Sequence, residues 1–159
     1  MPIRIKTNET TDAWRAMLLA HRRVTHELDR DLRTRTDLNL GWYEVLLVLA
    51  GSDDERLRMN ELADKMILSR SATTRLVDRL ERDGLVDRFV CDSDRRGMEV
   101  MLTDEGREKF LEAGRIHFSG IQDRFGGHLT DEELATITLA LGRVAEANAH
   151  PGTDHPCPS

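Results

Sequence analysis

Apolar side chains recur every three or four residues near the start of the chain. Over residues 11–34 one face of this pattern carries Trp14, Leu18, His21, Val24, Leu28 and Leu32. Steps of three and four residues are typical of one face of an α-helix. We therefore expect one long helix there, and a second helix over 40–50 that Asn39 caps and Gly51 ends.

Two shorter helical segments follow, close together in the sequence. The first is expected over 60–66, and a link through Ile67 and Leu68 leads to Ser69, a residue type that favours helix N-caps. The second is then expected over 70–83. Its apolar stripe is Ala72, Leu76 and Leu80, with Thr73 and Val77 beside it.

The hydrophobic period then changes from that of a helix to that of a strand. Residues 86–90 and 98–102 alternate as strands do, and the segment 91–97 between them is polar and turn-forming. This pattern predicts a β-hairpin with a charged tip.

Two further helices complete the pattern, over about 104–125 and 131–149, the latter opened by a capping box at Thr130. The fold class expected is mainly α with a small β-hairpin wing. Four segments are expected: an N-terminal helix in 1–36, a central module in 37–103, C-terminal helices in 104–149 and a disordered tail in 150–159.

Composition narrows the class of protein. The longest apolar run, 45–50, is far shorter than a membrane span needs, and the N-terminus has no apolar signal-peptide core. Two cysteines among 159 residues cannot form a disulfide framework. These features predict a cytoplasmic protein without membrane attachment.

Chemistry-bearing motifs of other kinds are missing from the sequence. The six histidines and two cysteines show no metal-ligand spacing, so neither a metal nor a cofactor is expected. No nucleophile–base pair or phosphate-binding loop is recognisable, and an enzyme is therefore not expected. Cys91 near Arg88 and Arg95 could be a lowered-pKa thiol, but a bystander at a strand end is the simpler interpretation.

Two short helices with a tight link, the second beginning with small polar residues, form the helix-turn-helix pattern, and the hairpin adds a wing. The net charge of the chain is −6, yet 69–82 holds four arginines against two acidic residues. Short side chains and the positive helix N-terminus favour contact with phosphates and base edges. The candidate DNA-binding residues are Ser69, Arg70, Ser71, Thr73, Thr74, Arg75, Arg79, Arg95 and Arg96. For Arg95 and Arg96 the alternative is a solvated turn held by Asp–Arg pairs.

A specific resemblance supports this pattern. The stretch Ser69-Arg-Ser-Ala-Thr-Thr-Arg-Leu-Val-Asp-Arg-Leu-Glu-Arg-Asp-Gly-Leu-Val, followed by Asp94, Arg96, Leu102, Thr103 and Gly106 at the wing, resembles the MarR family of winged helix-turn-helix regulators. The resemblance covers about residues 38–106. It implies a homodimer whose terminal helices interlace, and which binds a pseudo-palindromic double-stranded DNA operator, most often as a ligand-responsive repressor.

The resemblance also implies a small aromatic or anionic effector, bound between the dimerisation helices and the DNA module. Candidate ligand-binding residues are Trp14, His21, Trp42, Tyr43 and His117. The two tryptophans sit at helical core positions, where packing is the simpler role. His21 fits an interface histidine, or a pH sensor because the ordinary pKa of histidine is about 6.5.

Overall acidity leaves a second function open. Residues 54–109 hold 12 basic and 14 acidic side chains. A winged-helix module that binds a protein partner or sequesters a ligand, without gripping DNA, is therefore the alternative to the regulator. A monomeric bundle is likewise the alternative to the dimer.

Overall fold

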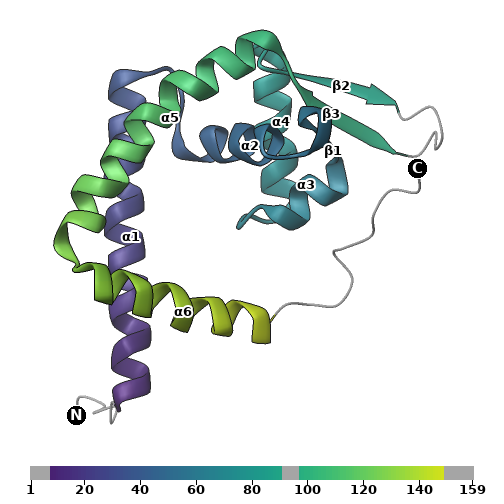
Figure 1. Ribbon diagram of the computed structural model, residues 1–159. Helices are drawn as coiled ribbons and strands as arrows, with labels where there is room; N and C mark the ends of the chain where they lie inside the picture. The colour runs from purple at the N-terminus through teal and green to yellow at the C-terminus, as the bar shows by residue number, and fades with distance from the viewer. Residues whose placement is uncertain (1–7, 91–96, 149–159) are drawn as a thin grey trace, which may run out of the picture.

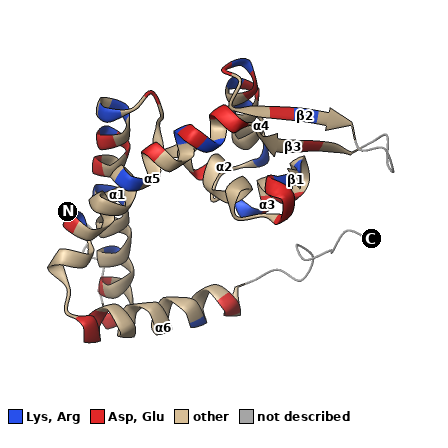
Figure 2. Cartoon of the chain, turned by 45° about the horizontal axis from the view of Figure 1, so that its top comes forward, with Lys and Arg blue, Asp and Glu red and all other residues tan. Residues whose placement is uncertain are grey.

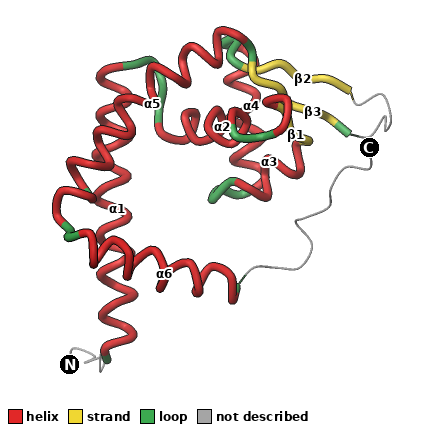
Figure 3. Tube along the Cα trace, in the orientation of Figure 1, coloured by secondary structure: helices red, strands yellow, loops and turns green. Residues whose placement is uncertain are grey.

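The computed structural model describes residues 8–90 and 97–148, and its chain is mainly helical (Figures 1 and 3). The helices are α1 (Glu9–Arg35), α2 (Leu40–Ala50), α3 (Met59–Lys65), α4 (Arg70–Arg82), α5 (Asp104–Arg124) and α6 (Asp131–Ala147). The strands are β1 (Arg56–Arg58), β2 (Val86–Val90) and β3 (Met98–Leu102). The six expected helices and both expected strands are confirmed. Within the described ranges no helix combines the length and apolarity that crossing a membrane requires.

Polar caps set the helix boundaries, as the sequence predicted. The Asn39 side chain accepts a hydrogen bond from the Trp42 amide at 3.0 Å, and the Ser69 hydroxyl accepts one from the Ala72 amide at 3.3 Å. At the end of α4, Gly84 adopts φ +73°, and the Leu85 amide donates to the Leu80 carbonyl at 2.9 Å. Glycine adopts that left-handed conformation without strain, so α4 ends sharply and the chain turns into β2.

The wing is a three-stranded antiparallel sheet rather than the two-stranded hairpin expected. Its strand order is β1-β3-β2, and Leu57 of β1 pairs with Val100 of β3. The sequence Arg-Leu-Arg of β1 is too short to show alternation. Pairing with β3 across more than 40 residues of sequence is what makes this segment a strand.

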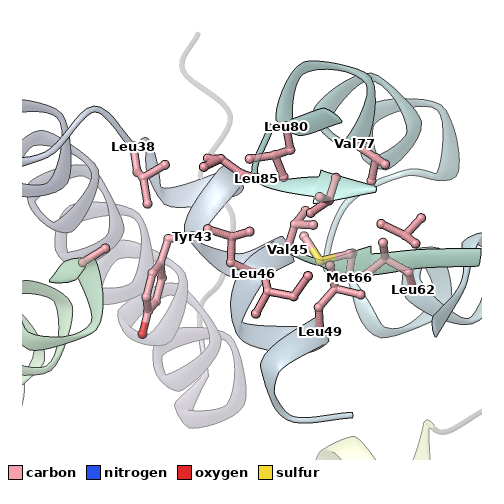
Figure 4. Packing of buried hydrophobic residues seen from close by; sticks show 14 of the residues in the cluster. Leu38, Tyr43, Val45, Leu46, Leu49, Leu62, Met66, Val77, Leu80 and Leu85 are labelled. Atoms are coloured by element: carbon pink, nitrogen blue, oxygen red, sulfur yellow. The ribbon is translucent and has the colours of Figure 1, made fainter. Parts of the chain in front are cut away.

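The core lies where α2 meets α3, α4 and the sheet (Figure 4). Val45, Leu46 and Leu49 of α2 are fully buried, and so are Leu62 of α3 and Leu80 of α4. On α4 the buried stripe is Thr73, Val77 and Leu80, whereas Ala72 and Leu76 are only half-buried. Leu80 is thus buried as predicted, whereas Thr73 and Val77, expected beside the stripe, take the core positions expected for Ala72 and Leu76, because α2, α3 and β2 contact that side of α4.

Leu32 of α1 and Ala113 of α5 also belong to this core; beyond it, α1 and α5 run side by side as long helices, and α6 extends from the end of α5 (Figure 1). Arg124 of α5 pairs with Asp31 of α1 at 2.5 Å and with Glu27 at 3.4 Å. None of the residues of α6 is buried. The chain thus has one packed module and a set of flanking helices that is only partly covered.

Candidate nucleic-acid interface

The first turn of α4 presents the short polar side chains that the sequence singled out. Ser69, Ser71 and Thr74 are exposed, and the two serine hydroxyl oxygens lie 3.3 Å apart. The Thr74 hydroxyl donates to the Arg70 carbonyl at 2.9 Å. This end of the helix is therefore open to solvent and lined by small hydrogen-bonding groups.

Arg75 and Arg79 lie one turn apart on the side of α4 opposite the buried stripe. Both side chains are exposed, and within the described ranges neither forms an ion pair. Together with Arg33 and Arg82 they line a groove between α4 and the junction of α1 with α2, which Trp42 also borders. Four arginines, three from α4 and Arg33 from α1, thus line one groove together with the carboxylate of Asp78.

Two of the predicted DNA-contacting residues have other surroundings. Thr73 is fully buried, and its hydroxyl donates to the Ser69 carbonyl at 3.2 Å, so the structure places it in the core. The guanidinium of Arg70 donates to Asp64 of α3 at 2.8 Å and to Asn60 at 3.3 Å. The side chain of Arg70 remains 64% exposed, so this ion pair holds α3 against α4 at the surface.

Arg88 of β2 is a residue whose position the sequence analysis missed. It donates to Asp78 at 2.6 Å and lies 3.5 Å from Glu81, the two carboxylates of α4. Its side chain is only 18% exposed. Strand alternation offered a signal, because Arg88 falls on the same face as the buried Val86. The wing strand therefore offsets part of the negative charge of α4, although the Asp78 and Glu81 side chains stay 46% and 42% exposed.

Outside this surface the charges are mixed in sign. Figure 2 shows Lys and Arg interspersed with Asp and Glu along α1 and α5. The positive character is consequently local to α4, and the net charge of −6 does not describe that surface. The wing-tip candidates Arg95 and Arg96, like Cys91, lie outside the described residues.

The five ligand-binding candidates have different surroundings in the described part of the chain. Tyr43 is buried and contacts His117, with ring centroids 4.5 Å apart, and it stacks on Phe110 at 5.7 Å. Trp42 instead borders the groove beside α4. Trp14 is 57% exposed and His21 is also exposed, both on α1. The structure thus brings Tyr43 and His117 together and separates them from Trp42.

Two titratable groups near this aromatic cluster have shifted pKa values. Burial lowers the pKa of His117, whose buried Nδ1 has no hydrogen-bond partner among residues 8–90 and 97–148. Burial raises the pKa of Glu44 on α2, and the charge of His21 acts in the opposite direction. Glu44 was not singled out from the sequence, although it is the lone carboxylate in the otherwise apolar stretch 40–50. Among the described residues, no cluster of three or more His, Cys, Asp or Glu side chains is placed to hold a metal ion.

Comparison with known proteins gives a consistent result. Residues 36–97 match the model of the MarR family. The chain is 40% identical over 97 residues to the HTH-type transcriptional repressor MdtR of Bacillus subtilis, covering 58% of this chain and 61% of that protein. It thus spans less than two thirds of the length of this curated relative.

Solved structures extend the similarity over nearly the whole chain. AbsC, a MarR family transcriptional regulator from Streptomyces coelicolor, is 34% identical with a TM-score of 0.82, covering 91% of this chain and 97% of that chain. Sco3205 from the same organism, solved in complex with DNA, is 33% identical with a TM-score of 0.85, covering 98% and 97%. With its winged helix-turn-helix fold and this extent of similarity, the chain belongs to the MarR family.

Proposed function

We propose that this chain is a sequence-specific DNA-binding transcriptional regulator, acting as a repressor from the cytoplasm. The observation that carries the proposal is the charge arrangement on α4. Arg75 and Arg79 face outward and form no ion pair with any residue that the structure describes, whereas Asp78 is paired to Arg88. Arginine is suited to bidentate contacts with phosphate and with guanine. The recognition surface comprises Ser69, Ser71, Thr74, Arg75 and Arg79, with Arg95 and Arg96 as wing contacts in the minor groove.

The proposal includes a homodimer. On α6, Leu134, Ile137, Leu141 and Val144 follow one another in steps of three, four and three residues, and none is buried within the chain. Exposed apolar side chains continue onto the other flanking helices at Trp14, Leu18 and Phe118. A large apolar area of this kind marks an interaction surface. A second copy covers it and presents a second α4, so the operator is a pseudo-palindrome.

An aromatic or anionic effector that releases the DNA is the remaining part of the proposal. Tyr43, Phe110 and His117 join α2 of the winged module to α5 of the flanking helices. A ligand that shifts this contact would alter how the module is held against the dimer. The competing function, a winged-helix module for protein binding or ligand sequestration, predicts no selective DNA binding.

Fluorescence anisotropy tests the proposal. The probes are the duplex upstream of the gene that encodes the chain, a duplex selected by the protein from random sequences, and a scrambled control, each at two salt concentrations. We expect selective binding that weakens steeply with salt, because arginine–phosphate contacts release counterions.

Two variants identify the surface. Arg75→Ala and Arg79→Ala should each weaken binding about tenfold or more, since a bidentate base contact is worth roughly 1–3 kcal/mol. Arg115→Ala, an exposed arginine of α5, is the matched control and should bind as the wild type does. A folded dimer without selectivity for any of the duplexes would refute the regulator in favour of the protein-binding module.

A further inference from the structure

The most exposed large apolar side chain in the described part of the chain belongs to Ile67. It is 85% exposed, more than Leu139, the most exposed large apolar residue of α6 at 69%. The preceding residue, Met66, is buried, and Ile67 stands two residues before the N-cap of α4. The core therefore uses Met66 to anchor the link between α3 and α4, and leaves Ile67 facing solvent.

The surroundings of Ile67 match the chemistry of DNA. From Lys65 to Val77 the sequence contains no acidic residue, although acidic residues outnumber basic ones in the whole chain. The nearest carboxylate upstream, Asp64, is paired with Arg70. The exposed neighbours are the partly exposed Leu68 and the hydroxyls of Ser69 and Ser71. This segment thus combines two exposed apolar side chains, Ile67 foremost, with hydrogen-bond donors and no uncompensated negative charge.

We propose that Ile67 is a specificity-determining residue that contacts the C5-methyl group of a thymine in the major groove. The inference rests on the proposed function, in which the N-terminal end of α4 enters that groove. The thymine methyl is the apolar group that base edges present there, and aliphatic side chains recognise it by contact. Ile67 then selects a thymine in each half-site through burial of its side chain.

A methyl-deletion experiment tests this contact directly. The operator is selected from random duplexes, and each thymine is replaced by deoxyuridine, which keeps base pairing and removes only the methyl. At one position in each half-site, replacing thymine with uracil should weaken wild-type binding about fourfold per half-site. A loss of that size is expected when one methyl group is no longer buried. Ile67→Ala should bind the thymine operator more weakly and show no further loss with uracil at that position.

Two controls make the result specific. Ile67→Val keeps a shorter branched side chain and should retain part of the discrimination between thymine and uracil. Leu111→Ala removes an exposed leucine on α5 and should discriminate as the wild type does.

Equal losses with uracil in the wild type and in Ile67→Ala, at every thymine, would overturn the inference and leave the proposed function intact. A wild-type protein that selects no operator at all would refute the proposed function as well, so the two failures are distinguishable.

Discussion

At the scale of a single residue, Arg88 reduces the negative charge that α4 presents. Its guanidinium pairs with Asp78 and lies near Glu81. Asp78 borders the same groove as Arg75 and Arg79, and without the cation of Arg88 its charge would repel phosphates more strongly. Arg88 is thus a positioning and charge-masking residue for the proposed interface, although it faces the protein and not the solvent.

Replacing Arg88 with methionine should weaken operator binding about tenfold at low salt. The effect should shrink at high salt, because mobile ions screen the uncovered carboxylates. Anisotropy titrations at two salt concentrations measure it. Adding Asp78→Asn to Arg88→Met should recover part of the affinity, which a merely unfolded variant would not do. Arg115→Met, on the exposed face of α5, serves as the unaffected control.

Gly106 is required at its position by a close backbone approach. A Cβ atom there would lie 2.0 Å from the Leu85 carbonyl oxygen and 3.0 Å from a methyl of Leu102. Gly106→Ala should therefore lower the free energy of unfolding by about 1–3 kcal/mol, the usual cost of overpacking. Urea unfolding measures the change.

Gly114 on the same helix provides the comparison. A Cβ there meets only the Tyr43 hydroxyl at 3.7 Å, an ordinary contact distance. Gly114→Ala should leave stability unchanged or raise it by up to about 1 kcal/mol, since alanine favours helix more than glycine. Equal destabilisation by both substitutions would contradict the steric account of Gly106.

At the scale of elements, the contact between α2 and α5 carries a pH dependence. Burial lowers the pKa of His117 below its ordinary 6.5. The unfolded chain then takes up a proton at a higher pH than the folded chain does, so stability falls as the pH falls through 6.5. His117→Gln should lose less free energy of unfolding than the wild type between pH 7.5 and pH 5.5, as measured by urea unfolding.

Glu44 shifts stability in the opposite sense. Its pKa is raised by burial, so its stabilising contribution is present below 4.5 and is lost as the pH rises through the folded-state pKa. Glu44 is present in both the wild type and His117→Gln. The difference between their profiles of unfolding free energy against pH therefore reports the titration of His117. Identical pH profiles for the wild type and His117→Gln would show that the imidazole is not the titrating group.

At the scale of the whole molecule, the flanking helices expose an apolar surface that one chain leaves uncovered. Leu141→Glu on the apolar stripe of α6 should shift the protein from dimer to monomer in sedimentation velocity. Operator affinity should fall as well, because a monomer carries one DNA-binding module and contacts only one half-site. Ala135→Glu, which helical spacing places on the opposite face of α6, should leave the dimer intact. A wild-type protein that sediments as a monomer would contradict the proposed assembly.

Local sequence determined where the elements lie. The caps Asn39, Ser69 and Thr130 bond to amides within the next three residues, so they act before any tertiary contact forms. The hydrophobic period likewise marked both wing strands. The family resemblance followed from the same short-range patterns.

Tertiary structure decided what depends on residues far apart in the chain. It made β1 a strand through β3, moved Thr73 into the core, and paired Arg70 with Asp64 and Arg88 with Asp78. Trp42 and Tyr43 are neighbours in sequence, but the fold gives them different surroundings: Trp42 borders the groove beside α4, and Tyr43 contacts His117. The physical reason is that burial and ion pairing are set by the neighbours that the fold supplies, whereas caps and periodicity are set by the residues next along the chain.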